Sequence, residues 1–331
     1  MRDDDYEGVS PEEARGVLEL EGAELQAAIA EACRLRERRH GRSVNLCWIV
    51  NARSGHCDQD CAFCSQSSRS RAEIRKHAML DPEQIVSDSR RAAQAGAVRY
   101  SIVTAGRAMR PGRDLDRVLE AAERIVEETG LAVCASLGVV EPPVLRALKD
   151  AGVSRYHHNL ETAESFWPRV CGTRPYEDSR RVIREARRIG LETCCGGVFG
   201  LGESLEQRIE LLDEVRRLAV DSTALNFFVP VAGTPLEGLD ELEPLDCLRI
   251  TVSARMMMPE VDVRICGGRE RNARELQAWL LPAGASGLMV GGYLTTGGRP
   301  VAEDLRMIAD SGFEPDSAPE GRTTVVGEKP Y

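Results

Sequence analysis

The alternation of short apolar runs with longer amphipathic segments limits what this chain of 331 residues can fold into. After about residue 42, eight strand-like runs alternate with eight segments of helical periodicity. The strand candidates span residues 43–52, 98–103, 132–137, 155–160, 192–199, 224–231, 261–266 and 287–291. The helical segments lie near residues 82–95, 114–129, 142–150, 177–189, 205–219, 244–258, 270–281 and 302–311. We therefore predict an α/β fold of the (β/α)8 TIM-barrel type, because eight regular units favour closure over a doubly wound sheet.

Signals at the segment ends support this reading. Asp81 and Pro82 followed by Gln84, and Ser204 followed by Gln207, are capping boxes that start helices. Residues 1–42 are expected to form an N-terminal helical extension, residues 43–315 the barrel and residues 316–331 a C-terminal tail. In such a barrel, functional side chains gather at the carboxyl ends of the strands.

Charge and composition exclude several classes of function. With 43 basic and 53 acidic residues the net charge is −10, which argues against binding to a nucleic-acid backbone. No apolar run is long enough to cross a membrane, and the acidic N-terminus lacks the apolar core of a signal peptide. We therefore expect a cytoplasmic protein, in which the 11 cysteines serve as metal or catalytic thiols and as core packing rather than as disulfides.

Three cysteines form the strongest local motif. Cys57, Cys61 and Cys64 follow the first strand candidate with the spacing C-x3-C-x2-C. Three thiolates on one loop can hold a four-iron cluster and leave one iron open to a small molecule. The alternative is half of a structural zinc site, but the adjacent His56 is poorly placed as a fourth ligand.

Further cysteines lie on alternate strands of the predicted barrel. Cys134 is on the third strand candidate, Cys194 and Cys195 are on the fifth, and Cys266 ends the seventh, with Arg264 on the same face as Cys266. Alternate strands fill one interior layer, so these thiols can converge on a second metal centre, although only one of the adjacent pair can face inward. The alternative is simple packing of buried cysteines. We interpret as packing residues the four cysteines that have no partner thiol on an alternate strand, which are Cys33, Cys47, Cys171 and Cys247.

Seven segments between about residues 45 and 315 carry a resemblance to a known family. They are NARSGHCDQDCAFCSQSS from residue 51, CASLGVVE from 134, RYHHNLET from 155, CCGGVFGLGE from 194, LNFFVPVAGTPL from 225, ARMMMPEVDVRICGGRE from 254 and YLTTGG from 293. They resemble the radical S-adenosylmethionine superfamily and, within it, the biotin synthase family. The cysteine motif alone is typical of the superfamily, whereas the other segments together indicate the narrower family.

The resemblance implies an activity and its cofactors. Cys57, Cys61 and Cys64 would hold a 4Fe–4S cluster that binds S-adenosylmethionine and yields a 5′-deoxyadenosyl radical. That radical would abstract hydrogen from dethiobiotin, and an auxiliary iron–sulfur cluster would donate the sulfur that completes biotin. The resemblance also implies an electron donor such as flavodoxin or ferredoxin, and a homodimer.

Binding residues follow from the resemblance position by position. Asn159 and Glu161 match positions that contact the ribose and the substrate. The positions that flank adenine are Gly196, Val198 and Gly200, and those that hydrogen-bond the polar ends of dethiobiotin are Asn226, Thr295 and Thr296. Strand alternation places His157 on the inward face with Asn159, as a donor to the ureido group or, alternatively, as a packed core histidine, and turns His158 toward the outer helices.

The chain departs from the common biotin synthases at its auxiliary cluster. Cys134, Cys194 and Arg264 match three ligand positions of a 2Fe–2S cluster, but the fourth position is Ser101, and Cys266 is an added thiol. This pattern resembles a variant form with a four-iron auxiliary cluster. We expect Cys134, Cys194 and Cys266 to meet at one level of the barrel, leaving a fourth iron to carry an expendable sulfide.

One ligand assignment and two other functions stay open. The arginine that meets the carboxylate of S-adenosylmethionine is displaced in the segment PYEDSRRVIREARR, which leaves Arg180 and Arg181 as candidates. A related radical barrel enzyme, similar to a hydrogenase maturase or to methylornithine synthase, is an alternative. A non-catalytic iron–sulfur or zinc protein is the alternative from another class, and it gives no role to the GGVFGLGE segment.

Overall fold

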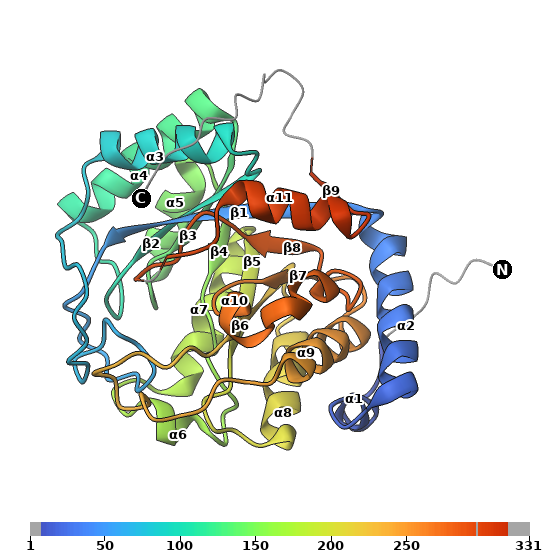
Figure 1. Ribbon diagram of the computed structural model, residues 1–331. Coiled ribbons are helices and arrows are strands. Elements are labelled where there is room, and N and C mark those ends of the chain that lie inside the picture. The colour runs from blue at the N-terminus through green and yellow to red at the C-terminus, as the bar shows by residue number, and fades with distance from the viewer. Residues whose placement is uncertain (1–7, 296, 317–331) are drawn as a thin grey trace.

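Eight parallel strands close around one axis in the computed structural model, which describes residues 8–295 and 297–316 (Figure 1). Neighbouring strands pair in the order β2-β3-β4-β5-β6-β7-β8-β1, and β1 pairs again with β2 to complete the barrel. The strands are β1 (Ser43–Arg53), β2 (Arg99–Thr104), β3 (Ala132–Ser136), β4 (Val153–His157), β5 (Glu192–Phe199), β6 (Ser222–Phe227), β7 (Asp262–Ile265) and β8 (Gly287–Met289). The predicted (β/α)8 architecture is confirmed.

Helices surround the barrel and connect its strands (Figure 1). They are α3 (Pro82–Gln94), α4 (Arg113–Thr129), α5 (Pro142–Asp150), α6 (Trp167–Val170), α7 (Tyr176–Ile189), α8 (Leu205–Arg217), α9 (Pro244–Met257), α10 (Arg269–Asn272) and α11 (Val301–Asp310), with a 3-10 helix at Arg274–Leu280. Two N-terminal helices, α1 (Pro11–Val17) and α2 (Gly22–His40), precede the barrel and pack against α9. In the described parts of the chain, no helix combines the length and apolar character needed to cross a bilayer.

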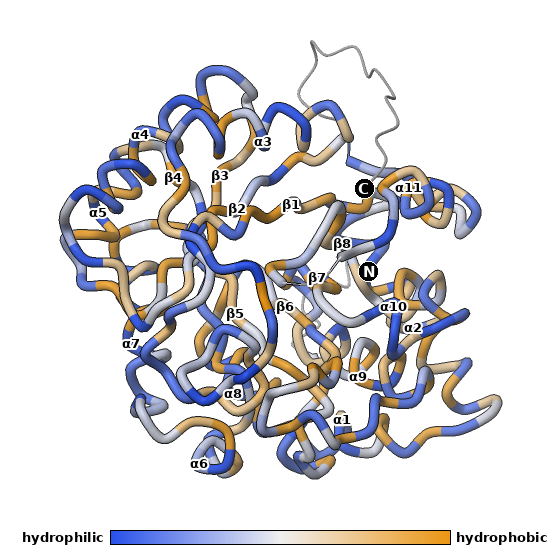
Figure 2. The backbone as a smooth tube through the Cα atoms, turned by 60° about the vertical axis from the view of Figure 1, so that its left-hand side comes forward, coloured by the Kyte–Doolittle hydropathy of each residue, from blue (hydrophilic) through white to orange (hydrophobic). Residues whose placement is uncertain are grey.

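The helices follow from local patterns in the sequence. In α4, Leu115, Val118, Ala122 and Ile125 are buried at three- and four-residue intervals, and the helix ends where Gly130 adopts a left-handed conformation. Both predicted capping boxes are present, at the starts of α3 and α8. Apolar residues are concentrated along the strands, whereas the outer helices alternate between apolar and hydrophilic positions (Figure 2).

The fourth strand differs from its predicted span of 155–160. Strand β4 ends at His157, but the chain continues alongside β5: His158 N donates to Cys194 O at 3.0 Å and Leu160 N to Gly196 O at 2.9 Å. Glu161 then adopts a positive φ of 72° and bridges Gly197. The predicted contact with the fifth strand therefore extends to residue 160, although the regular strand is shorter than predicted.

Smaller elements were not predicted. The segment 270–281 divides into α10 and the 3-10 helix, because Arg274 adopts a positive φ of 47° between them. A short strand β9 (Glu314–Pro315) pairs with the start of β1 outside the barrel ring. The expected tail lies outside the described residues apart from Asp316.

Candidate active site

A cavity of about 420 Å³ opens at the carboxyl ends of the strands and extends into the barrel. Its lining includes both groups of cysteines singled out in the sequence. The thiols that line it are Cys47, Cys57, Cys61, Cys64, Cys134, Cys194 and Cys266. The cluster loop and the barrel interior therefore form one continuous site.

The loop between β1 and α3 carries the C-x3-C-x2-C motif at the mouth of this cavity. Gln66 ties the loop to its base, since its Oε1 accepts from Gly55 N at 2.9 Å. Cys64 N donates to Cys61 O, which turns the chain between the second and third thiols. Burial raises the pKa of Cys64 to about 11, so this thiol ionises in the neutral range only when a cation such as iron binds it.

Cys171, predicted to be a packing residue, lies beside this loop. Its thiol hydrogen-bonds Cys61, and this contact lowers the pKa of Cys171 to about 6 and raises that of Cys61. The thiol is also 3.5 Å from Thr173 Oγ1. No spacing rule connects residues 61 and 171, so sequence reasoning had no signal for this contact.

Four residues on alternate strands lie at one height inside the barrel. In a barrel of this type neighbouring strands are staggered by about one residue. If the pairing is followed across two strands, the residue at the original height therefore lies about two positions further along than the residue reached. Cys47 pairs with Arg99, Arg99 pairs with Ala132, and two positions beyond Ala132 is Cys134. Repeating this step closes the ring, and the residues at this height, which we call the thiol level, are Cys47, Cys134, Cys194 and Arg264.

Cys266 lies above the thiol level, in contrast to the expectation that it shares a level with Cys134 and Cys194. It is two positions beyond Arg264, which places it roughly 5 Å nearer the carboxyl ends of the strands. It nevertheless packs in one buried cluster with Cys194 and Ala224. The thiol that shares the level is Cys47, which had been interpreted as core packing.

The adjacent cysteines of β5 point in opposite directions, as predicted. Cys194 lines the cavity, whereas Cys195 is fully buried in the core outside it. Burial opposes ionisation of Cys194, but the neighbouring His157 overcomes this and lowers the pKa of Cys194 to about 6. Burial raises the pKa of Cys266, which has no such partner. Cys194 is therefore better prepared than Cys266 to bind iron as a thiolate.

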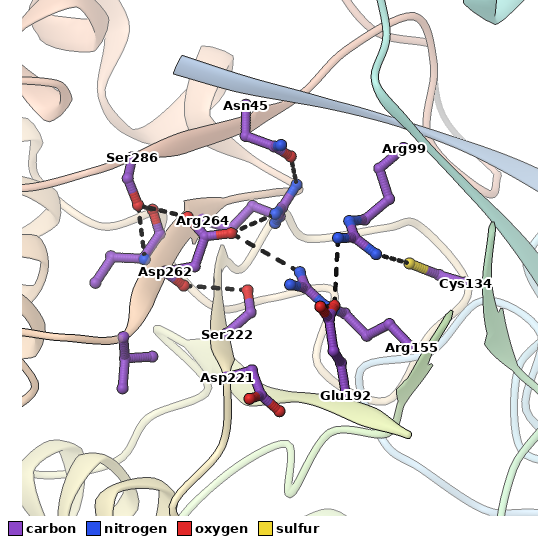
Figure 3. Close-up of polar contacts among 12 residues, drawn as sticks. Asn45, Arg99, Cys134, Arg155, Glu192, Asp221, Ser222, Asp262, Arg264 and Ser286 are labelled. Atoms are coloured by element: carbon purple, nitrogen blue, oxygen red, sulfur yellow. Dashed lines mark hydrogen bonds and ion pairs between the residues drawn. The ribbon is translucent and has the colours of Figure 1, made fainter. Parts of the chain in front are cut away.

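Charged side chains at the thiol level, and two positions before it on the strands, form the floor of the cavity; Figure 3 shows their contacts. Arg264 donates to Asn45 Oδ1 at 2.7 Å and to Asp262 Oδ2 at 2.6 Å, which fixes its guanidinium. Arg155 Nε donates to Glu192 at 2.9 Å, and Arg155 also lines a second cavity at the opposite end of the barrel. These pairs stabilise buried charge and separate the thiols from that opposite end.

Arg99 joins this floor to a thiol (Figure 3). Its Nη1 is 3.5 Å from Cys134 Sγ and its Nη2 is 3.3 Å from Glu192. Ser101, two positions further along β2, lines the cavity and is buried. The thiol set is thus surrounded by arginines, which favours an anionic group among the thiols.

Polar side chains lie between the two groups of cysteines. Asn159 and Glu161 line the cavity, and Asn159 Nδ2 donates to Glu161 at 3.2 Å while Asn159 Oδ1 is buried without a protein partner. Asn226 lines it from β6, held by Gly197 O and Gly267 N. Thr295 lies at the rim, 3.0 Å from Ser65 Oγ, and Thr296 is outside the described residues.

The two histidines at the end of β4 point in different directions, as predicted. His157 lines the cavity beside Cys194. His158 is buried, and its Nε2 is 3.2 Å from Ser179 on α7. It also meets Arg174, so one edge of this ring reaches the cavity wall.

The glycine-rich segment that follows Cys195 on β5 does not line this cavity. A Cβ on Gly196 would lie 1.9 Å from Ala224 O, so this glycine permits close packing of β5 against β6. Val198 N donates to Glu161 O at 2.7 Å, which fixes the backbone of that cavity residue. Gly200 N donates to Glu203 at 2.8 Å. In this structure the segment therefore positions Glu161.

The two candidate arginines for the S-adenosylmethionine carboxylate both lie outside the cavity. Arg180 is held on the outer surface by Glu164 and Glu214, and Arg181 is partly exposed near Glu141. Arg174 does line the cavity, is 7% exposed, and has a buried Nε without a protein partner. Its charge acts on Cys57 and Cys61, which places it beside the cluster loop.

These features define a radical S-adenosylmethionine barrel, and comparison with known proteins agrees. The Radical SAM superfamily profile matches residues 52–215, and the profile of the Biotin and Thiamin Synthesis associated domain matches residues 224–314. The structure resembles that of methylornithine synthase with a TM-score of 0.82 at 21% identity, covering 93% of this chain and 94% of that one, which shows the shared fold.

The narrower family follows from curated relatives. The chain is 47% identical over 302 residues to biotin synthase from Geobacter sulfurreducens, covering 91% of this chain and 92% of the relative. Biotin synthase from Pelobacter propionicus gives the same identity and coverage. The chain belongs to the biotin synthase family and is a radical S-adenosylmethionine enzyme.

The residues present fit the groups that this family implies. Among the described residues, no three ligands converge on a single metal-ion position, but an iron–sulfur cluster is several atoms wide and takes its thiolates from around its edges. The loop offers three thiols to a 4Fe–4S cluster. The partnerless Asn159 Oδ1 and Arg174 Nε are a hydrogen-bond acceptor and a donor that a polar ligand such as S-adenosylmethionine can satisfy.

Proposed function

We propose that this enzyme converts dethiobiotin to biotin by radical sulfur insertion. The observation that carries the proposal is the single cavity, which has three loop thiols at its mouth, barrel thiols at its base and polar side chains between them. A substrate held between the two thiol groups lies next to a radical source on one side and a sulfur source on the other. Such an arrangement converts a reaction between three components into one within a single complex.

The cofactors supply the reactive chemistry and the chain supplies position. When bound, the loop cluster with S-adenosylmethionine supplies the hydrogen-abstracting radical, and the auxiliary cluster supplies sulfur. Cys57, Cys61 and Cys64 hold the first cluster. Burial of the base of the cavity and the charged floor beneath it exclude water, which protects a carbon radical from side reactions.

Recognition of S-adenosylmethionine falls to polar groups near the loop. Asn159 and Glu161 face its ribose, where Glu161 can accept hydrogen bonds from hydroxyl groups. We assign Arg174 as the partner of the S-adenosylmethionine carboxylate. It is a buried cavity arginine beside the loop, and its Nε donates to none of the described residues. The glycine strand, with Gly196, Val198 and Gly200, takes part by fixing the backbone around the adenine side.

Recognition of dethiobiotin falls to groups deeper in the cavity. His157, on the inner face of β4, donates to the ureido oxygen; Cys194 beside it raises the pKa of the imidazole against the opposing effect of burial. Asn159, Asn226 and Thr295, together with Thr296, provide the remaining hydrogen bonds to the polar ends of the substrate. These groups fix which carbon atoms face the two clusters.

The auxiliary cluster is proposed to be of the four-iron type. Cys134, Cys194 and Cys266 are its ligands, with Arg264 beside them and Ser101 too poor a ligand to complete a 2Fe–2S site. The buried cluster that Cys194 and Cys266 share with Ala224 favours this set, because it brings the added thiol to the same part of the cavity.

The cellular setting is also a proposal. The described chain holds 11 free cysteines and its redox chemistry needs low-potential electrons, which suits the cytoplasm and a donor such as flavodoxin or ferredoxin. A homodimer is carried over from the family resemblance. No nucleic acid or membrane is proposed as a partner.

Anaerobic turnover tests the proposal. Reconstituted enzyme is incubated with dethiobiotin, S-adenosylmethionine and a reductant, and biotin and 5′-deoxyadenosine are measured. Both products are expected. Formation of 5′-deoxyadenosine without biotin or a thiolated intermediate would reject sulfur insertion into this substrate, and a protein that binds zinc but no iron would reject the radical mechanism altogether.

A further inference from the structure

Cys47 is a cavity thiol for which the proposed reaction has no role. It lies in the middle of β1 and is 6% exposed. Among the described residues its one hydrogen-bond contact is a distant one, 3.9 Å from Sγ to the carbonyl oxygen of Trp48. The thiol is therefore buried in the cavity wall, and no described residue makes a close hydrogen bond to its sulfur.

The register places Cys47 among the proposed ligands. It completes the thiol level with Cys134, Cys194 and Arg264, so these four side chains point toward the barrel axis at one height. Its electrostatic neighbours are the same groups, led by Arg264 and followed by Cys134, Arg99 and Cys194. By register, Cys47 is closer in height to Cys134 and Cys194 than Cys266 is.

The surroundings of Cys47 differ from those of the packing cysteines. Cys195 and Cys247 are fully buried among apolar side chains of the core, and neither lines the cavity. Cys47 instead adjoins arginines and other thiols on the cavity surface. A packing role explains Cys195 and Cys247, but it does not explain a thiol in a polar, cationic ring.

We infer that Cys47 is a further thiolate ligand of the auxiliary cluster, bound from the first strand at the level of Cys134 and Cys194. This inference rests on the proposed function, because it requires an iron–sulfur cluster at the base of the barrel. It raises the thiols available to that cluster to four, three of them at the thiol level and Cys266 one level nearer the substrate. A four-iron cluster has one iron for each, so this inference replaces the expectation that a fourth iron is left without a thiolate.

The test isolates the auxiliary cluster and counts its iron. A background variant with Cys57→Ala, Cys61→Ala and Cys64→Ala removes the loop cluster, and the protein is reconstituted anaerobically with iron and sulfide. This background should hold about four irons per chain. Adding Cys47→Ala should lower the content to about three or fewer and change the electron paramagnetic resonance spectrum of the reduced cluster.

Two controls and one alternative variant keep the result interpretable. Cys195→Ala and Cys247→Ala, in the same background, should leave both iron content and spectrum unchanged. Cys47→Ser keeps nearly the same side-chain size, so if Cys47→Ala fails to fold, a changed spectrum in the serine variant still supports ligation. Unchanged iron and an unchanged spectrum in the folded Cys47 variant would overturn the inference. A background variant that holds no iron would instead overturn the auxiliary cluster itself.

Discussion

The guanidinium of Arg174 lies 2.7 Å from Nε2 of His158, and both side chains are buried. An arginine always donates, so His158 accepts through an unprotonated Nε2. This contact holds the arginine against the cavity wall while its Nε stays without a protein partner. Within the described residues no carboxylate forms an ion pair with Arg174, so the contact with His158 explains how a cation is held near the cluster loop.

Replacing Arg174 should weaken binding of S-adenosylmethionine. A hydrogen bond between charged groups is worth about 1.5–3 kcal/mol, so Arg174→Gln should raise the dissociation constant roughly 10- to 100-fold. Equilibrium binding to the cluster-loaded protein measures this directly. Arg180→Gln is the matched control, because Arg180 faces Glu164 and Glu214 outside the cavity, and it should bind normally. Equal affinities in the two variants would contradict the assignment.

The protonation state of His158 predicts how the free energy of unfolding depends on pH. Burial, and then Arg174, lower the pKa of His158 well below 6.5 in the folded protein. Below about pH 6.5 the unfolded chain binds a proton here that the folded protein does not, so stability should fall as pH decreases through this window. Thermal unfolding of wild type and His158→Gln between pH 7.5 and 5.5 checks this. The variant should lose less stability across that range, and parallel curves would show that His158 is not responsible.

Packing of β5 against β6 should tolerate no side chain at Gly196. A Cβ there would lie 1.9 Å from the backbone oxygen of Ala224, so Gly196→Ala should cost about 1–3 kcal/mol of unfolding free energy or prevent folding. Gly238→Ala is the control, since nothing lies within 4 Å of its added Cβ. Unfolding midpoints compare the two. Equal midpoints would mean that the strands separate at little cost.

The loop cluster should depend on each of its three thiols. Cys61→Ala removes one of them, so the loop cluster should be lost and S-adenosylmethionine should stay intact when a reductant is added. Quantifying 5′-deoxyadenosine after anaerobic incubation tests this. Normal production by the variant would be incompatible with the ligand assignment.

Iron content distinguishes a four-iron from a two-iron auxiliary cluster. Two four-iron clusters give about eight irons per chain, against about six for a four-iron plus two-iron enzyme. Cys266→Ala should abolish biotin formation and lower the iron content of the auxiliary cluster, yet retain reductive cleavage of S-adenosylmethionine. Cys195→Ala should be much milder, because that side chain points into the outer core. About six irons in the wild type, or an intact second cluster in Cys266→Ala, would show that the added thiol was misassigned.

Local sequence patterns were sufficient for the fold and for the loop cluster. The strands and helices follow from periodicity and capping, which are interactions between residues a few positions apart. The C-x3-C-x2-C motif is equally local, because one turn of loop brings its three thiols to the same cavity. The opposite orientations of Cys194 and Cys195, and of His157 and His158, follow from strand alternation alone.

The partners of the remaining cavity residues depended on how the strands are staggered and where loops cross. Alternation shows that Cys47 and Cys266 sit on particular faces, but the height of each depends on the register accumulated around the barrel. Likewise, Cys171 meets Cys61, and Arg174 rather than Arg180 or Arg181 reaches the cavity, because the segment after β4 lies against the cluster loop, where Ala62 N donates to Val170 O. Contacts between distant segments are set by packing of the whole chain, which leaves no periodic signal in the sequence.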